Sequence, residues 1–192
     1  MKADTPAIGR GLDAYARDCH SSRKMAEKSA RARLDAFISR YSRDVAATAR
    51  AAFLKMRRRL PGAVVLVYDN YNALAIGFGP TERASDAIVS LALFPRWVSL
   101  FFLQSGAAMT DPLRLLKGTG KRARHIVLSP AADLDAPAVE SLIVQALALA
   151  SSPIDRKGRG RIVIKSVSAT QRPRRPSATP RKAPASRVDR DS

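Results

Sequence analysis

Apolar and polar positions recur along this chain with two different periods, and these periods separate predicted helices from predicted strands. Leu34, Phe37 and Ile38 have the spacing of one helix face. A second helical stretch follows Ser42, a residue type that caps helix N-termini, and stops at Pro61-Gly62. Its apolar positions keep helical spacing for about four turns; they are Val45, Ala49, Ala52, Phe53, Met56 and Leu60.

Short apolar runs beyond residue 62 predict β-strands. Four of them follow one another closely, at 63–68, 74–78, 87–94 and 97–103. Such short links favour antiparallel neighbours, because a parallel pair needs a crossover of about a dozen residues or more. Two later runs, at 125–128 and 161–167, predict two further strands.

The run from Ala87 to Leu103 is also long enough to resemble a membrane segment. Pro95-Arg96 interrupts it at its middle. An arginine at the centre of a bilayer costs about 2.5–3.5 kcal/mol on insertion scales. Two buried strands joined at Pro95-Arg96 explain the run better, and no membrane association is expected.

Two further helical segments are predicted in the second half of the chain. Residues 111–116 form a short amphipathic piece. Asp135 can cap a helix that has Pro137 in its first turn. The apolar face of this last helix consists of Val139, Leu142, Ile143, Ala146, Leu147 and Ala150. The predicted fold class is α+β, with an antiparallel sheet of about five to six strands packed against helices.

The chain divides into one domain and two flanks. Residues 1–30 have weak periodicity and are predicted to be a weakly structured extension, and Met25 could itself be a translation start, which would leave 1–24 without a role in the fold. Residues 31–168 form the predicted domain. Residues 169–192 are rich in proline and arginine and poor in apolar bulk, so they are predicted to be a disordered basic tail.

The net charge of +18 is unevenly distributed. Residues 31–60 carry nine basic and two acidic side chains, and residues 151–192 carry twelve and three. Residues 61–150 carry seven of each and are therefore neutral. Charge held in one helical segment and the C-terminus supports nucleic-acid binding only weakly, whereas a uniformly basic domain would support it strongly.

Residue types that carry out catalysis or bind metals are sparse. Cys19 is the single cysteine, which excludes an intramolecular disulfide and fits a reducing cytoplasm. With two histidines in the chain there is no metal-ligand cluster of the usual spacing, and no nucleophile elbow is present. We therefore expect a protein that is not an enzyme and that uses no cofactor.

The loop Leu115–Ile126 combines two glycines with four basic side chains and His125. It is not a nucleotide-binding P-loop, because Leu115 stands where that motif needs glycine and Arg122 where it needs a hydroxyl. Two interpretations remain. Gly118 could be a helix C-cap in the left-handed region with solvated basic neighbours, or the backbone and the cations could form a weak anion site.

The candidate anion or ligand contacts are Lys117, Lys121, Arg122, Arg124, His125 and Tyr68. His125 at the start of a strand is more typical of a structural histidine than of an acid–base catalyst. Tyr68 flanks a turn, where it could line a pocket, stack on a base or pack over the edge of the sheet. The candidate nucleic-acid contacts are Arg43, Arg50, Arg57, Arg172, Arg174 and Arg175; their alternative is a solvated surface and a solubilising tail.

The order of elements and several local strings resemble the YdhG-like family, a group of largely uncharacterised bacterial domains with a frataxin-like fold. The strings are 33–38, 60–63, 68–74, 116–121, 124–126 and 160–169. The resemblance implies an α+β domain with an antiparallel sheet against helices. It implies little about activity, since fold does not fix function.

Three function classes follow. The first is a non-catalytic cytoplasmic binding domain of unknown ligand. The second is nonspecific nucleic-acid binding through the basic helix and the tail, with affinity that falls steeply in salt. The third is iron handling by analogy with frataxin, against which the residues argue: 31–60 holds only Asp35 and Asp44 among nine basic residues, and ferrous iron prefers carboxylate and imidazole ligands.

Overall fold

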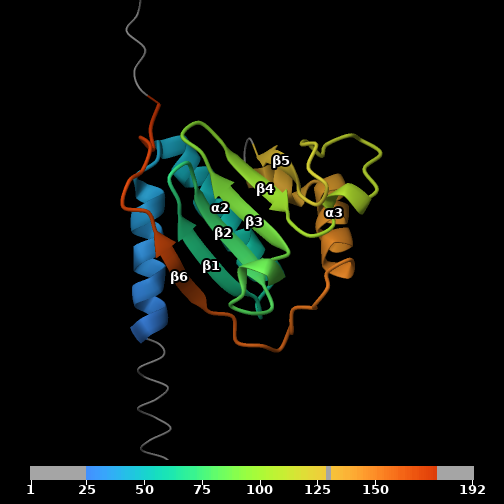
Figure 1. The fold of residues 1–192 in the computed structure, drawn as a ribbon, viewed down its shortest axis with the longest axis horizontal. Helices are drawn as coiled ribbons and strands as arrows, with labels where there is room; N and C mark the ends of the chain where they lie inside the picture. The colour runs from blue at the N-terminus through green and yellow to red at the C-terminus, as the bar shows by residue number, and fades with distance from the viewer. Residues whose placement is uncertain (1–24, 129–130, 177–192) are drawn as a thin grey trace, which may run out of the picture.

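Helices cover one face of a six-stranded sheet in the computed structural model, which describes residues 25–128 and 131–176 (Figure 1). Cys19, the extension 1–24 and the tail beyond residue 176 lie outside the described residues. The described part of the N-terminal helix covers 25–39. The other α-helices are α2 (Arg43–Arg59) and α3 (Pro137–Ala148).

The strands lie close to the predicted positions. They are β1 (Val64–Asp69), β2 (Leu74–Gly79), β3 (Val89–Leu93), β4 (Val98–Phe102), β5 (Arg124–Leu128) and β6 (Ile162–Val167). Short 3-10 turns interrupt the loops: η1 (Ala84–Asp86), η2 (Gly106–Ala108) and η3 (Ala131–Asp135). The run 87–103 therefore forms two strands joined by a turn, as predicted, and no described helix is long and apolar enough to cross a membrane.

The sheet is mixed, which corrects the prediction of an antiparallel sheet. The order is β5-β4-β3-β2-β1-β6, and the five strands from β1 to β5 pair antiparallel with their neighbours. β6 pairs parallel to β1 at the edge. The prediction of antiparallel pairs rested on the short links between consecutive strands, which join only β1 to β4. β6 follows α3 after a long crossover, and a long crossover permits a parallel pair.

Two glycines let the crossover pass close to the start of β1. A Cβ on Gly62 would lie 1.7 Å from the carbonyl oxygen of Asp155, and one on Gly160 would lie 2.4 Å from that of Pro61. Arg57 of α2 donates to the carbonyls of Ala63 and Gly160 at 3.3 and 3.5 Å. These contacts bring β6 into register beside β1.

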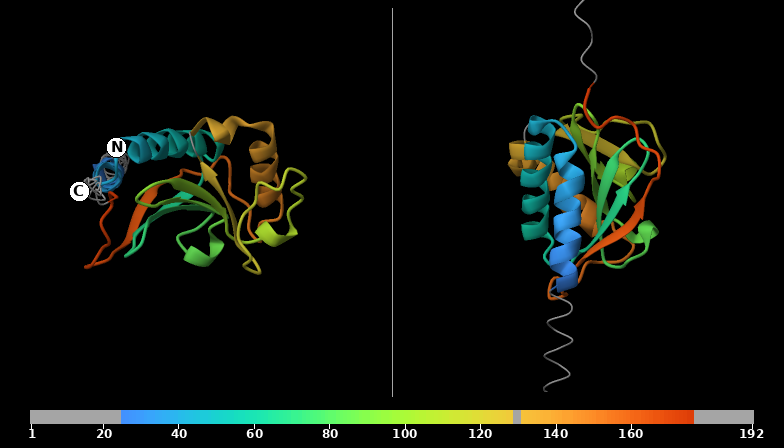
Figure 2. Two further views of the ribbon diagram at one scale, coloured as in Figure 1. Left: turned by 90° about the horizontal axis from the view of Figure 1, so that it is seen from above. Right: turned by 90° about the vertical axis from the view of Figure 1, so that its left-hand side faces the viewer.

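One face of the sheet supplies most of the core. Side chains such as Val65, Ile76 and Leu91 point towards the helices and are fully buried with Phe53 and Met56 of α2. The two views in Figure 2 show the helices gathered on this side of the sheet. Among the described residues, the opposite face carries the short 3-10 turn η1 but no α-helix, and we call it the open face.

The folded part of the chain differs at both ends from the expected range of 31–168. Residues 25–30 belong to the N-terminal helix, and Glu27 accepts a hydrogen bond from the backbone of Ile162 at 2.9 Å. At the other end, Arg174 is only 6% exposed. Arg174 is buried because it pairs with the carboxylate of Asp69, a residue far from it in the sequence.

Asp69 is completely buried and holds both ends of the fold together. Its Oδ1 accepts from Arg174 at 2.8 Å, and its Oδ2 accepts from Arg40 and, at 2.6 Å, from Gln171. Arg174 also donates to the backbone carbonyls of Asn70 and Tyr71. We call these four side chains (Asp69, Arg40, Gln171 and Arg174) the Asp69 cluster.

Two local predictions in the second half of the chain are wrong. Residues 111–116 form a turn and extended backbone rather than a helix, because the Asp111 carboxylate accepts from the backbone of Leu116 at 2.7 Å and Arg114 has a positive φ of 53°. Asp135 does not cap α3, whose N-cap is Ala136. It pairs instead with Lys55 and Arg59 of α2.

Candidate ligand-binding site

The open face contains a pocket of about 320 Å³. It is formed by a difference in side-chain size between neighbouring strands. Leu66 of β1 is followed across the sheet by Gly77, Ser90 and Phe101, which are its successive partners on β2, β3 and β4. The two central strands therefore carry small side chains and the two flanking strands carry large ones.

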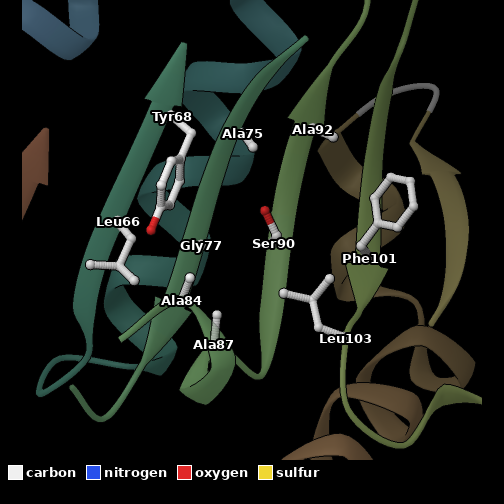
Figure 3. A pocket seen from close by; sticks show the side chains of 10 residues that line it. All are labelled: Leu66, Tyr68, Ala75, Gly77, Ala84, Ala87, Ser90, Ala92, Phe101 and Leu103. Atoms are coloured by element: carbon white, nitrogen blue, oxygen red, sulfur yellow. The ribbon is translucent and has the colours of Figure 1, made fainter. Parts of the chain in front are cut away.

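A second row of partners repeats this pattern. Tyr68 of β1 faces Ala75 of β2, which faces Ala92 of β3. Small residues thus form the floor, while Tyr68 and Phe101 stand as aromatic walls on either side (Figure 3). Ala84 and Ala87, at either end of η1, line it too, as does Leu103.

The pocket is almost entirely apolar. Its ten lining residues carry two side-chain hydroxyls, those of Tyr68 and Ser90, and no carboxylate, amine or imidazole. The Ser90 hydroxyl contacts the carbonyl of Leu91 at 3.4 Å. Among the described residues, none hydrogen-bonds to the Tyr68 hydroxyl. Mostly apolar concavities of about 300–1,000 Å³ with a few polar groups are typical of small-molecule sites.

The predicted anion loop lies beside this pocket and is a hairpin rather than a helix end. Lys117 and His125 exchange backbone hydrogen bonds of 2.7 and 3.0 Å. Gly118 has a φ of 103° in the left-handed region, as one interpretation required, but it follows a β-bridge and not a helix. The Arg124 guanidinium closes the turn by donating to the carbonyls of Gly120 and Ala123.

The six candidate anion or ligand residues do not converge on one point. Tyr68 lines the pocket. His125 is next to it, because its ring stacks on Phe101 with centroids 4.8 Å apart. Lys117, Lys121 and Arg122 are exposed on the hairpin.

The pKa of His125 is lowered, first by burial of the imidazole and second by the positive charge of Lys117. We expect Lys117→Met to raise this pKa, because the like charge is removed, and to leave it below the ordinary value, because the burial remains. NMR titration of the imidazole in a His20→Asn background, where His125 is the only histidine, measures the change. An unchanged pKa would show that Lys117 does not act on the ring.

This lowered pKa also sets a pH dependence of stability. As the pH falls below about 6.5, the unfolded chain takes up the proton before the folded chain does. The contribution of His125 to stability is therefore complete above that pH and is lost on acidification.

The candidate nucleic-acid residues are spread over the molecule. Arg43 is exposed at the start of α2, whereas Arg50 donates to the Ser39 hydroxyl at 2.6 Å and Arg57 to backbone carbonyls. Arg174 is buried in the Asp69 cluster, so it is not free to contact a phosphate. Arg172 and Arg175 are exposed beside it.

Metal binding finds no support in the part of the chain that the structure describes. Within 25–128 and 131–176, no group of three or more His, Cys, Asp or Glu side chains is placed to hold a metal ion.

The pocket residues other than Tyr68 were not identified from the sequence. The signal that could have found them is the period-two pattern of β2 and β3, in which small residues alternate with large ones. Ala75 and Gly77 alternate with Leu74, Ile76 and Phe78, and Ser90 and Ala92 alternate with Val89, Leu91 and Leu93. Such a pattern in two paired strands indicates a hollow on one face.

Comparison with known proteins adds no second source for a function. No family model, curated protein or solved structure matches this chain.

Proposed function

We propose that this chain is a non-catalytic binding domain of the YdhG-like type that its motifs resemble, and that the pocket on the open face holds its ligand. The proposal rests on the floor of small side chains that lies between Tyr68 and Phe101 in this pocket. Burying apolar ligand surface there yields roughly 25 cal/mol per Å² before the costs of association.

The lining chemistry supports binding rather than catalysis. General acid–base catalysis needs a group that exchanges protons near neutral pH, and the pocket lining offers only the Tyr68 phenol and the Ser90 hydroxyl. Both can hydrogen-bond to a ligand and fix its orientation. The ligand class that fits is a small, flat, mainly apolar molecule with one or two polar atoms.

Titration with the neutral naphthalene dye prodan tests this function. The dye has a flat apolar body and a carbonyl acceptor, and its neutrality avoids attraction to a chain of charge +18. We expect saturable binding at one site with a blue-shifted emission. Absence of saturable binding would contradict the proposal.

Pocket-filling variants test the position of the site. Ala75→Leu and Gly77→Val place methyl groups over the floor, and a Cβ on Gly77 would lie 3.5 Å from the Ala87 Cβ, an ordinary contact. We expect each to weaken prodan binding about tenfold or more, since a filled pocket excludes the dye. Ala47→Leu, at an exposed position of α2, is the matched control and should bind as the wild type does. Equal binding by all variants would place the dye elsewhere.

A further inference from the structure

Two adjacent turns at one end of the sheet each expose an aromatic ring. Tyr71, in the β1–β2 turn, is 50% exposed, and Trp97, in the β3–β4 turn, is 43% exposed. The turns are neighbours because β2 and β3 pair Leu74 with Leu93, the residues that flank them. Both turns lie at the upper end of the sheet in Figure 1.

These rings are accessible rather than part of the core. Trp97 stacks on Phe94 with ring centroids 5.2 Å apart and an interplanar angle of 28°, so one face is supported while much of the ring remains exposed. The backbone of Tyr71 is fixed, since its carbonyl accepts a hydrogen bond from the backbone of Arg172 at 3.0 Å. Exposed aromatic rings on a fixed backbone are suited to stacking on another flat group.

Exposed arginines lie in or beside both turns. Arg96 is exposed within the second turn, and the segment 168–176 brings exposed Arg172 and Arg175 to the first. Asp69 is the only acidic residue in 69–73, 94–97 and 168–176. It is completely buried between Arg40 and Arg174, so these segments present no exposed carboxylate that would repel an anion.

We propose that this end of the sheet, which we call the aromatic end (Tyr71, Trp97, Arg96, Arg172 and Arg175), binds single-stranded nucleic acid. Unpaired bases stack on aromatic rings without sequence preference, and nearby cations contact the phosphates. A duplex keeps its bases stacked inside and cannot use the rings in this way. The proposal goes beyond the pocket and does not depend on it. The aromatic end includes none of the arginines of α2.

Fluorescence anisotropy with the full chain and a labelled strand of about ten thymidines tests the proposal. Tyr71→Ala/Trp97→Ala should weaken binding about tenfold or more, because stacking on each ring is lost. The same double variant should bind an abasic strand of equal length as the wild type does, since that strand has phosphates but no bases. Tyr71→Phe/Trp97→Phe keeps the rings and should restore thymidine binding. Failure of the alanine variant to weaken thymidine binding, or equal weakening on the abasic strand, would overturn the proposal.

Charge-matched variants separate this surface from general attraction to the basic chain. Affinity falls as salt rises, so the slope of log affinity against log salt is negative. Arg96→Gln/Arg172→Gln/Arg175→Gln should make this slope shallower by about 2, because about three phosphate contacts are removed. Arg33→Gln/Arg43→Gln/Arg58→Gln removes the same charge from exposed positions of the helical layer and should change the slope little. An equal effect of both sets, or tighter binding to duplex than to single strand, would contradict the proposal. Both triple variants should leave prodan binding unchanged. The nucleic-acid proposal and the pocket proposal can therefore be contradicted separately.

Discussion

Replacing Asp69 with alanine is expected to lower the free energy of unfolding by about 3–5 kcal/mol, the cost of breaking a buried ion pair from one side. Arg174 would keep its two backbone acceptors but lose the carboxylate that neutralises its charge. Arg40, whose side chain is 38% exposed, can turn towards water, so Arg174 carries most of the penalty.

Urea denaturation measures this loss, and limited trypsin digestion after Arg174, which is 6% exposed and is followed by Arg175 rather than proline, reports whether residues 168–176 detach. We expect both lower stability and faster cleavage for Asp69→Ala. Glu82→Gln is the control, because Glu82 pairs with Arg161 and Lys165 on the exposed surface, where an ion pair contributes little. A change no larger than that of the control would show that the Asp69 cluster does not hold the C-terminal segment.

Gly62→Ala is expected to cost about 3 kcal/mol, at the upper end of overpacking substitutions. The new Cβ would lie 1.7 Å from the Asp155 carbonyl oxygen, which is backbone and cannot rotate away as a side chain could. The crossover would have to move, and with it the hydrogen bond of 2.8 Å from the backbone of Val65 to the carbonyl of Arg161. The parallel pairing of β6 with β1 should weaken first.

Thermal unfolding measures the loss for Gly62→Ala, and amide hydrogen exchange on β1 and β6 locates it. Gly120→Ala is the matched control, since its Cβ would lie 3.4 Å from the nearest atom, the carbonyl oxygen of Ala123. We expect the control to keep wild-type exchange on β6. Wild-type stability of Gly62→Ala would mean that the crossover has room that the structure does not show.

The strands and the longer helices could be predicted because their signals are local. The period of Val45 to Leu60 is helical, and the runs 63–68 and 74–78 are bounded by turn residues. Two predictions failed where a side-chain contact, short-range for Asp111 and long-range for Asp135, overrode the sequence pattern. Asp111 holds the backbone of Leu116 and prevents a helix, and α2 draws Asp135 away from the cap position.

In the candidate sites, too, local patterns could be predicted and contacts between distant residues could not. For Tyr68 the sequence left a pocket as one of three possible surroundings, whereas Phe101 and Gly77 become pocket residues only through the register of four strands. Arg174 falls in the predicted basic tail because residues 169–192 are rich in proline and arginine and poor in apolar bulk, while its partner Asp69 lies 105 positions away. A contact between two residues so far apart produces no periodic pattern in the sequence from which it could be predicted.

A crystal structure of the full chain grown with prodan would show directly where the ligand binds. We expect density for the naphthalene ring between Tyr68 and Phe101, over Gly77 and Ser90, with the carbonyl within hydrogen-bond distance of the Tyr68 or the Ser90 hydroxyl. Dye bound on another surface, with the pocket closed by the chain's own side chains, would contradict it.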